Sequence, residues 1–155
     1  MGQQQLLLLV LATVIVGLAT VAGIQAFEQG SVRANQDALT QTAVKIASDI
    51  QAKAKEPSQF GGYDGNLTGS PAAKGNVSLS ALGYETSSGI YQAADGECKI
   101  TTGGESAGGT LSNGSEVSGV SGDIKVTCTS ADNSVTAGIS SLDPSGITSD
   151  AEVNN

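Results

Sequence analysis

The two cysteines, Cys98 and Cys128, are the residues with the clearest chemistry in this chain of 155 residues. Two cysteines allow one intramolecular disulfide, which persists in oxidising compartments. Their spacing is far too wide for a CxxC redox or haem motif, and because the chain has no histidine a zinc site is nearly excluded. We therefore expect a Cys98–Cys128 disulfide, which would stabilise the fold by roughly 3–4 kcal/mol in the chain-entropy picture.

The other polar residues form no catalytic constellation. Without histidine, Ser–His and Cys–His nucleophilic schemes fail, and no phosphate-binding loop motif is present. Asp95 and Glu97 could act as a carboxylate pair, but on a hairpin tip we expect them to be solvated. A calcium site using Asp143, Asp150 and Glu152 has no motif support. We expect no enzymatic activity, no metal and no cofactor.

Charge and modification signals point to an outward-facing polar part. The net charge is -8, and an acidic surface repels phosphate backbones, so a nucleic-acid partner is not expected. Three Asn-x-Ser/Thr sequons occur, at Asn66, Asn76 and Asn113. Three is near the chance number for a chain rich in these residues, so unmodified asparagines are the favoured interpretation. Serine- and threonine-rich loops could equally carry O-linked sugars.

A long apolar run dominates the N-terminal part of the sequence. The segment from Leu6 to Ile24 is uncharged and mostly aliphatic, and no Lys or Arg occurs before Arg33. A helix needs about 20 apolar residues to cross a bilayer, so this run is long enough to do so. Since no basic residues precede the run and it is retained after Met1, a cleaved signal peptide is the least favoured interpretation.

Residues 1–55 are expected to form one continuous helix, because no proline interrupts the chain before Pro57. After the apolar run, apolar residues recur three, four and seven positions apart, which predicts an amphipathic continuation. They are Val32, Leu39, Ala43, Ile46, Ile50 and Ala54. Pro57 and the Gly61-Gly62 pair then end the helix.

The remainder of the sequence predicts a small antiparallel sheet. Residues 56–78 are rich in Gly, Ser and Asn and are expected to form a loop. Short alternating runs with β-branched residues then predict strands with one face in water. These runs are residues 77–82, 90–93, 98–102, 124–128 and 135–139. Asp95-Gly96, between the second and third runs, is a hairpin signal.

Two segments carry little strand signal. Gly103 to Gly122 is a long loop rich in Gly, Ser and Glu, which the disulfide would hold against the sheet. Residues 141–155 are polar and favour a tail. The predicted fold is therefore α+β, with a long N-terminal helix packed on a small antiparallel sheet. Its parts are an apolar helix over residues 1–26, an amphipathic continuation over 27–55 and a β domain over 56–155.

This layout resembles that of type IV pilins and related type IV filament subunits. In that family a short mature N-terminus precedes an apolar stretch of about this length and a continuing amphipathic helix. A loop, a small antiparallel sheet and a disulfide-bounded segment near the C-terminus follow. The match covers nearly the whole chain and is closest over residues 1–60, where segments 22–27 and 43–50 fall where such helices leave the filament core.

The resemblance implies a structural subunit of an extracellular filament for adhesion or motility, with a membrane-inserted precursor pool. Its partners would be its own copies, an inner-membrane assembly machine and a prepilin peptidase. Met1 would be the first mature residue, with a methylated amine that lies close to Gln5 at a contact between copies. The filament core would consist of aliphatic side chains of the apolar run: Leu6, Leu7, Leu8, Leu9, Val10, Leu11, Val14, Ile15, Val16, Leu18, Val21 and Ile24.

Two positions depart from the family pattern. The family usually has a glutamate at the fifth mature position, which neutralises a neighbour's amine, and Gln5 cannot cancel that charge. The amine could stay near solvent, residues 3–5 could bond neighbouring chains, or the numbering could start elsewhere than at the mature end. The proline that many bacterial members carry within the apolar helix is also missing, so Gly17 or Gly23 would provide a melted stretch instead.

Two other functions stay open at this point. One is a pseudopilin of a secretion or DNA-uptake system, which would form a short periplasmic piston. The other is a surface-binding module anchored by a single membrane span, which would be monomeric in detergent and would bind a soluble ligand through residues 60–155.

Overall fold

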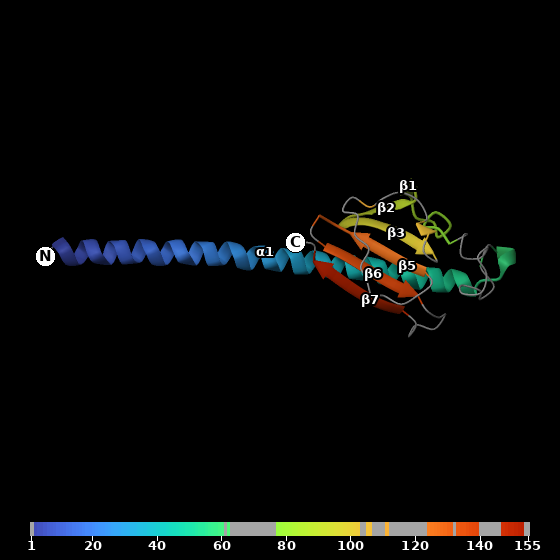
Figure 1. Cartoon of the computed structure of the whole chain (residues 1–155), viewed down its shortest axis with the longest axis horizontal. Helices are drawn as coiled ribbons and strands as arrows, with labels where there is room; N and C mark the ends of the chain where they lie inside the picture. The colour runs from blue at the N-terminus through green and yellow to red at the C-terminus, as the bar shows by residue number, and fades with distance from the viewer. Residues whose placement is uncertain are drawn as a thin grey trace. The chain divides into compact units, whose positions relative to one another are not determined.

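The computed structural model describes residues 2–60, 62, 77–102, 105–106, 111, 124–131, 133–139 and 147–153. These residues form a long helix, α1 (Gly2–Lys55), a short 3-10 helix, η1 (Ser58–Phe60), and a set of strands (Figure 1). The strands are β1 (Thr86–Ser87), β2 (Ile90–Ala93), β3 (Gly96–Thr102), β4 (Glu105–Ser106), β5 (Ile124–Thr129), β6 (Asn133–Ile139) and β7 (Ile147–Val153). The chain divides into two compact units, residues 1–34 and 35–155, each described by itself.

The strands form one antiparallel sheet, which confirms the predicted α+β class. Its order is β1-β2-β3-β5-β6-β7, and β4 pairs with the end of β3. The longest strands, β3, β5, β6 and β7, lie side by side at its centre and along one edge (Figure 1). Every pairing is antiparallel, so short turns join neighbouring strands along most of the sheet.

The second half of α1 supplies one side of the core and lies across one face of the sheet (Figure 1). Of the predicted apolar positions in this half, Leu39, Ala43, Ile46, Ile50 and Ala54 are buried, and Ala47, which was not among them, is buried as well. They share one cluster with sheet residues Cys98, Ile100, Ile124, Val126, Cys128, Val135, Ala137 and Ile139. Of the predicted apolar positions in the helix, Val32 is the exception, since it is half-exposed.

The helix ends where its sequence predicts. The last helical residue is Lys55, and the amides of Phe60 and Gly62 both donate to the carbonyl oxygen of Pro57. Gly62 lies so close to the backbone of Glu56 that an added Cβ would be 2.0 Å from the carbonyl oxygen of Glu56. Only glycine therefore fits this turn, which closes the carbonyl end of α1.

The predicted hairpin between the second and third runs is present, with a shift of one residue. Ala93 pairs with Gly96, so Ala94 and Asp95 form the turn and Gly96 begins β3. A second two-residue hairpin joins β1 to β2 through Ser88 and Gly89, whose φ angles are 55° and 82°. Two positive φ values are typical of a type I′ turn.

Gly96 lies close both to the backbone of β5 and to a side chain of α1. A Cβ there would lie 2.2 Å from the carbonyl oxygen of Thr129 and 3.0 Å from a methyl group of Leu39. We expect Gly96→Ala to lower the free energy of unfolding by about 1–3 kcal/mol, because a backbone must move to make room. Urea unfolding measures the change, and Gly30→Ala, with nothing within 4 Å, is the control. Equal stabilities of the two variants would contradict the close approach.

The prediction of a strand over residues 77–82 is wrong. Val77 and Leu79 are buried in the core, but the chain turns there instead of pairing. The hydroxyl of Ser78 accepts the amide of Ala81, and the amide of Tyr84 returns to the carbonyl oxygen of Leu79. Serine competes for backbone groups in this way, so an alternating pattern that contains it also suits a turn.

The prediction of one face in water is also wrong for β5 and β6. Every described residue of β6 is buried, and the sheet face opposite the helix-side core is buried as well. Thr127 and Thr136 lie opposite each other on that face and their hydroxyls share a hydrogen bond of 3.1 Å. Because paired hydroxyls satisfy one another, alternating threonine does not require water.

The predicted polar tail is in part a strand. Residues 147–153 form β7, which pairs with β6 along its whole length, from Asn133↔Val153 to Ile139↔Ile147. Residues 141–146 lie outside the described part of the chain. Within the predicted loop from Gly103 to Gly122, the described residues include β4 and the buried Leu111.

Candidate assembly surface

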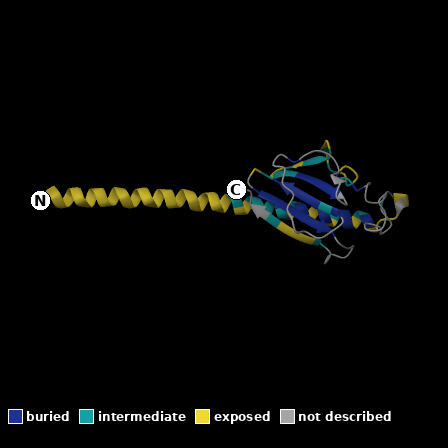
Figure 2. Ribbon diagram, viewed as in Figure 1, coloured by how far each residue is buried: buried dark blue, intermediate teal, exposed yellow. Residues whose placement is uncertain are grey.

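The first unit exposes its apolar side chains on all sides. The twelve large aliphatic residues between Leu6 and Ile24 are each between 53% and 71% exposed, and Phe27 is 79% exposed. Figure 2 shows this part of α1 in the exposed colour, in contrast to the dark-blue strand β6 of the second unit. Within that segment α1 is long and apolar enough to cross a membrane.

This surface has no polar side to face water. In a water-facing helix, apolar residues form one stripe and polar residues cover the rest, as they do between residues 35 and 55. Between Leu6 and Ile24 the polar side chains are Thr13 and Thr20 alone. A helix that is apolar all round must be surrounded, either by lipid or by other apolar helices.

The two threonines of this run add little polarity to its surface. The hydroxyl of Thr13 donates to the carbonyl oxygen of Val10 at 2.9 Å, and that of Thr20 donates to Gly17 at 2.8 Å. Their hydrogen bonds are therefore made inside the helix, and apolar surroundings leave no hydroxyl donor unpaired. The first charged residues, Glu28 and Arg33, follow the run.

The glycines of the run leave the helix intact. The sequence predicts a melted stretch at Gly17 or Gly23, but α1 continues as a helix through both and through Gly30. A Cβ at any of the three would meet nothing within 4 Å. Because glycine has no side chain, each of these positions leaves a notch in the helix surface, where the backbone of another helix can approach closely. Small residues act in this way between packed membrane helices.

The start of the helix carries amides instead of acids. Gln3, Gln4 and Gln5 are exposed, and the first turn has no acidic residue. Amide oxygens can accept hydrogen bonds from the free amide groups that begin any helix, although they carry no charge. Met1 lies outside the described residues, so the predicted contact between Met1 and Gln5 is a prediction still.

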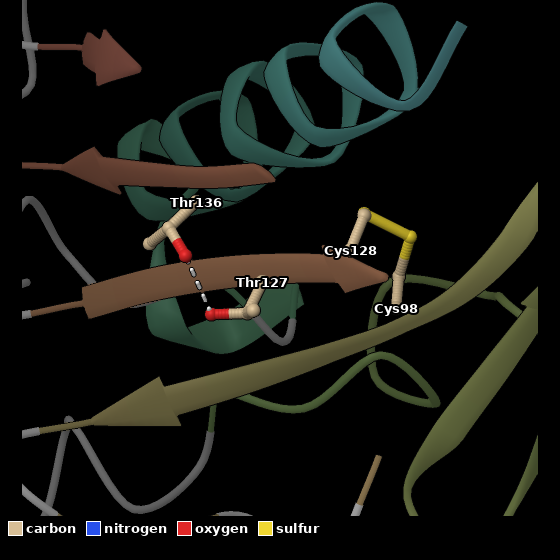
Figure 3. Close-up of a disulfide and its surroundings, with 4 residues drawn as sticks. All are labelled: Cys98, Thr127, Cys128 and Thr136. Carbon is tan, nitrogen blue, oxygen red and sulfur yellow. Dashed lines mark hydrogen bonds between the residues drawn. A yellow bond between two sulfur atoms is a disulfide. The ribbon is translucent and has the colours of Figure 1, made fainter. Parts of the chain in front are cut away.

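The predicted disulfide joins Cys98 of β3 to Cys128 of β5 (Figure 3). The two residues are directly opposite one another, with Cα atoms 4.0 Å apart, and both are fully buried against the helix. The bond therefore links two neighbouring strands at the centre of the sheet. It encloses the segment between β3 and β5 in a loop, as the sequence predicted. Both cysteines are buried in the core.

Tyr84, in the segment just before β1, forms a side-chain hydrogen bond to the helix α1. Its hydroxyl donates to the Asp49 carboxylate at 2.5 Å, and its ring packs edge-on against Tyr91 with centroids 4.9 Å apart. Burial and the bond to Asp49 raise the pKa of Tyr84 well above its usual value of 10.0. The sequence gives no signal for this pair, because the two residues are 35 positions apart.

We expect Tyr84→Phe to lower the free energy of unfolding by about 1–2 kcal/mol, because Asp49 loses its donor. The folded chain holds the phenol proton of Tyr84 more tightly than the unfolded chain does. The contribution of Tyr84 to the free energy of unfolding is therefore fully present below pH 10 and is lost as the pH rises above it. Urea unfolding at pH 7 and above pH 10 measures both effects. An equally steep fall in wild type and Tyr84→Phe would contradict the assignment to Tyr84.

The acidic residues considered for catalysis or calcium do not gather in the described part of the chain. Asp95 is exposed on its turn, and Glu97 accepts a hydrogen bond of 2.9 Å from Gln92. Asp150 lies on β7, whereas Asp143 is outside the described residues. No group of three potential ligands occurs among the described residues. The sequons at Asn66, Asn76 and Asn113 are also outside them.

Comparison with protein-family models, curated proteins and solved structures found no match. The apolar run and the cysteine pair could both be found from the sequence. The close approach of Gly96 to Thr129, the Tyr84–Asp49 bond and the edge strand β7 could not, because each depends on contacts between residues that are separated along the chain.

Proposed function

We propose that this chain is a structural subunit that polymerises through its N-terminal helix into an extracellular type IV pilus-like filament. The observation that carries the proposal is the apolar segment between Leu6 and Ile24, exposed on every side, at the start of a helix whose later residues pack on a disulfide-linked sheet. The order of these parts is that of the family which the sequence resembles.

The proposed mechanism is assembly. Before assembly, lipid covers the apolar segment, which is long enough to span a bilayer. During assembly, apolar segments of other copies replace the lipid, and close packing between the helices holds them together. Outside the membrane, separating the helices would expose their apolar area to water at a cost of ~25 cal/mol per Å². The notches at Gly17, Gly23 and Gly30 allow neighbouring backbones to approach.

The second unit would form the outer surface of the filament. Its strands are held by the Cys98–Cys128 bond, which suits an oxidising environment outside the cytoplasm. Its acidic side chains would face solvent and set the character of the surface for adhesion or motility. The assembly machinery of the inner membrane and a prepilin peptidase are the partners that this function requires.

Electron microscopy of material sheared from the producing cells, with mass spectrometry of its main band, tests the proposal. Long filaments made of this chain are the expected result. Short filaments confined to the periplasm would favour a pseudopilin instead. A chain that stays in the membrane fraction as a monomer would overturn the proposal in favour of a single-span binding module.

A further inference from the structure

The first unit carries two charged side chains, Glu28 and Arg33, and both are exposed. Neither forms an ion pair with another described residue. No lysine or arginine lies within four positions of Glu28, and Arg33 follows it by five, which turns through about 140° on a helix. Since side chains meet along a helix at spacings of three or four, Glu28 has no cation to pair with on its own helix. An assembly that surrounds this segment must supply one from another chain.

Glu28 and Arg33 each end a row of residues that repeats every seven positions. Seven positions make just under two helical turns, so the members of one row lie on one face of the helix. The large row consists of Leu7, Val14, Val21 and Glu28, and its three aliphatic side chains are between 53% and 71% exposed. The small row consists of Ala12, Ala19, Ala26 and Arg33, which are exposed as well (Figure 2).

The two rows match each other when parallel helices are displaced by five residues. Each member of the small row follows a member of the large row by five positions, which is about 7.5 Å along the helix axis. At that displacement a large aliphatic side chain of one copy lies level with an alanine of the other, three times in succession, and Glu28 lies level with Arg33. Alanine leaves room for the larger side chain, so the two backbones can approach closely.

Other arrangements of two copies lose this complementarity. Two large rows packed without displacement set Glu28 against Glu28, and two small rows set Arg33 against Arg33, so that like charges meet. In an antiparallel pair that brings Glu28 level with Arg33, Val14 would lie level with Ala47. Ala47 is fully buried in the core beside the sheet, so that face is not available. Charge and size therefore both favour a parallel, displaced second copy.

We propose that the large row of one copy docks on the small row of the next, and that an ion pair between Glu28 and Arg33 of the two copies fixes their displacement. Each copy offers both rows, on faces about 140° apart, so one helix contacts two neighbours through different surfaces. Because every step also advances along the axis, this contact continues from copy to copy instead of closing into a ring. The inference rests on the proposed function and adds which faces meet and at what displacement.

Cysteine pairs test the docking in filaments of the full-length chain. Val14→Cys/Ala19→Cys places one thiol in each row, at one level of the proposed contact. Under mild oxidation we expect a ladder of dimers, trimers and longer products, because each copy becomes bonded to two neighbours. Val14→Cys/Ala12→Cys is the matched control, since it uses the same rows with thiols about 10.5 Å apart along the axis, and it should cross-link at least about ten times more slowly. The native cysteines do not interfere, because they are bonded to each other and buried.

Exchange of the two charges tests the ion pair without any added thiol. Glu28→Arg sets two cations against each other at every contact, so the amount of sheared filament should fall at least about ten-fold. The double variant Glu28→Arg/Arg33→Glu restores unlike charges and should return the amount to that of wild type. Asp37 lies four positions beyond Arg33, but the two form no ion pair with each other. Asp37→Asn is therefore the control and should leave the amount unchanged.

The two experiments separate this inference from the proposed function. Equal cross-linking of the two cysteine pairs overturns the inference, and so do normal filaments from Glu28→Arg or a double charge exchange that fails to restore them. The charge variants carry no added cysteine, so they decide the question even where the thiols disturb assembly. Wild-type filaments in any of these cases leave the proposed function standing. A wild-type chain that forms no filaments contradicts the proposed function, and this inference falls with it.

Discussion

Leu9→Asp and Val16→Asp are each expected to abolish filaments. Both side chains are more than 60% exposed in the first unit, at 64% and 62%, and the proposed assembly surrounds them with apolar side chains. A carboxylate in such surroundings costs roughly 2.5–3.5 kcal/mol even at the centre of a membrane helix, and every copy in the filament would bear that cost. Electron microscopy of sheared material measures the outcome, and immunoblotting of membranes shows whether the variant is still made.

Gln41→Asp is the matched control for this pair of variants. It adds the same charge to the same helix, at an exposed position of the half that packs on the sheet. We expect it to form filaments in wild-type amounts. Normal filaments from Leu9→Asp or Val16→Asp would show that the segment is not an assembly core, and the proposed function would then fail.

The second large effect is expected from loss of the disulfide. Replacing both Cys98 and Cys128 with alanine should lower the free energy of unfolding by about 3–4 kcal/mol, because the bond closes a loop with a sequence separation of 30. For a sheet with few large core residues this is a substantial share of total stability. Urea unfolding followed by tyrosine fluorescence measures it, since Tyr84 and Tyr91 pack against the core.

The single variants provide the internal control. Because the bond needs both sulfur atoms, Cys98→Ala and Cys128→Ala should each lose nearly as much stability as the double variant. Reduction of the wild-type chain under denaturing conditions should reproduce the same loss. A double variant as stable as wild type would mean that pairing of β3 and β5 alone fixes the sheet and that the bond contributes little.

Hydrophobic patterning predicted the helix and most of the central strands. The spacing of Leu39, Ala43, Ile46 and Ile50 specifies which side of α1 is buried, since the helical period places them on one face. Pro57 and Gly62 specify where the helix ends, because one cannot continue it and the other alone fits the turn. These are local properties of the chain, so neighbouring residues determine them.

Two predictions from the sequence are contradicted by the structure for the same physical reason. Residues 77–82 alternate as a strand would, but their buried side chains, Val77 and Leu79, reach the core from a turn. Thr127 and Thr136 are polar and yet buried, because each supplies the other's hydrogen bond. In both cases the environment of a residue depends on what lies opposite it in space, which local pattern does not contain.

The sequence by itself determined that the apolar run must be covered, because no arrangement of Leu6 to Ile24 on a helix leaves a polar side. It also determined that Cys98 and Cys128 are the one possible disulfide. Only the tertiary structure decided that the bond lies in the core, that Tyr84 meets Asp49, and that residues 147–153 complete the sheet. Residues 147–153 carry only a weak apolar pattern, in which Ile147 and Ala151 pack against the core, and pairing with β6 along the whole strand fixes their place.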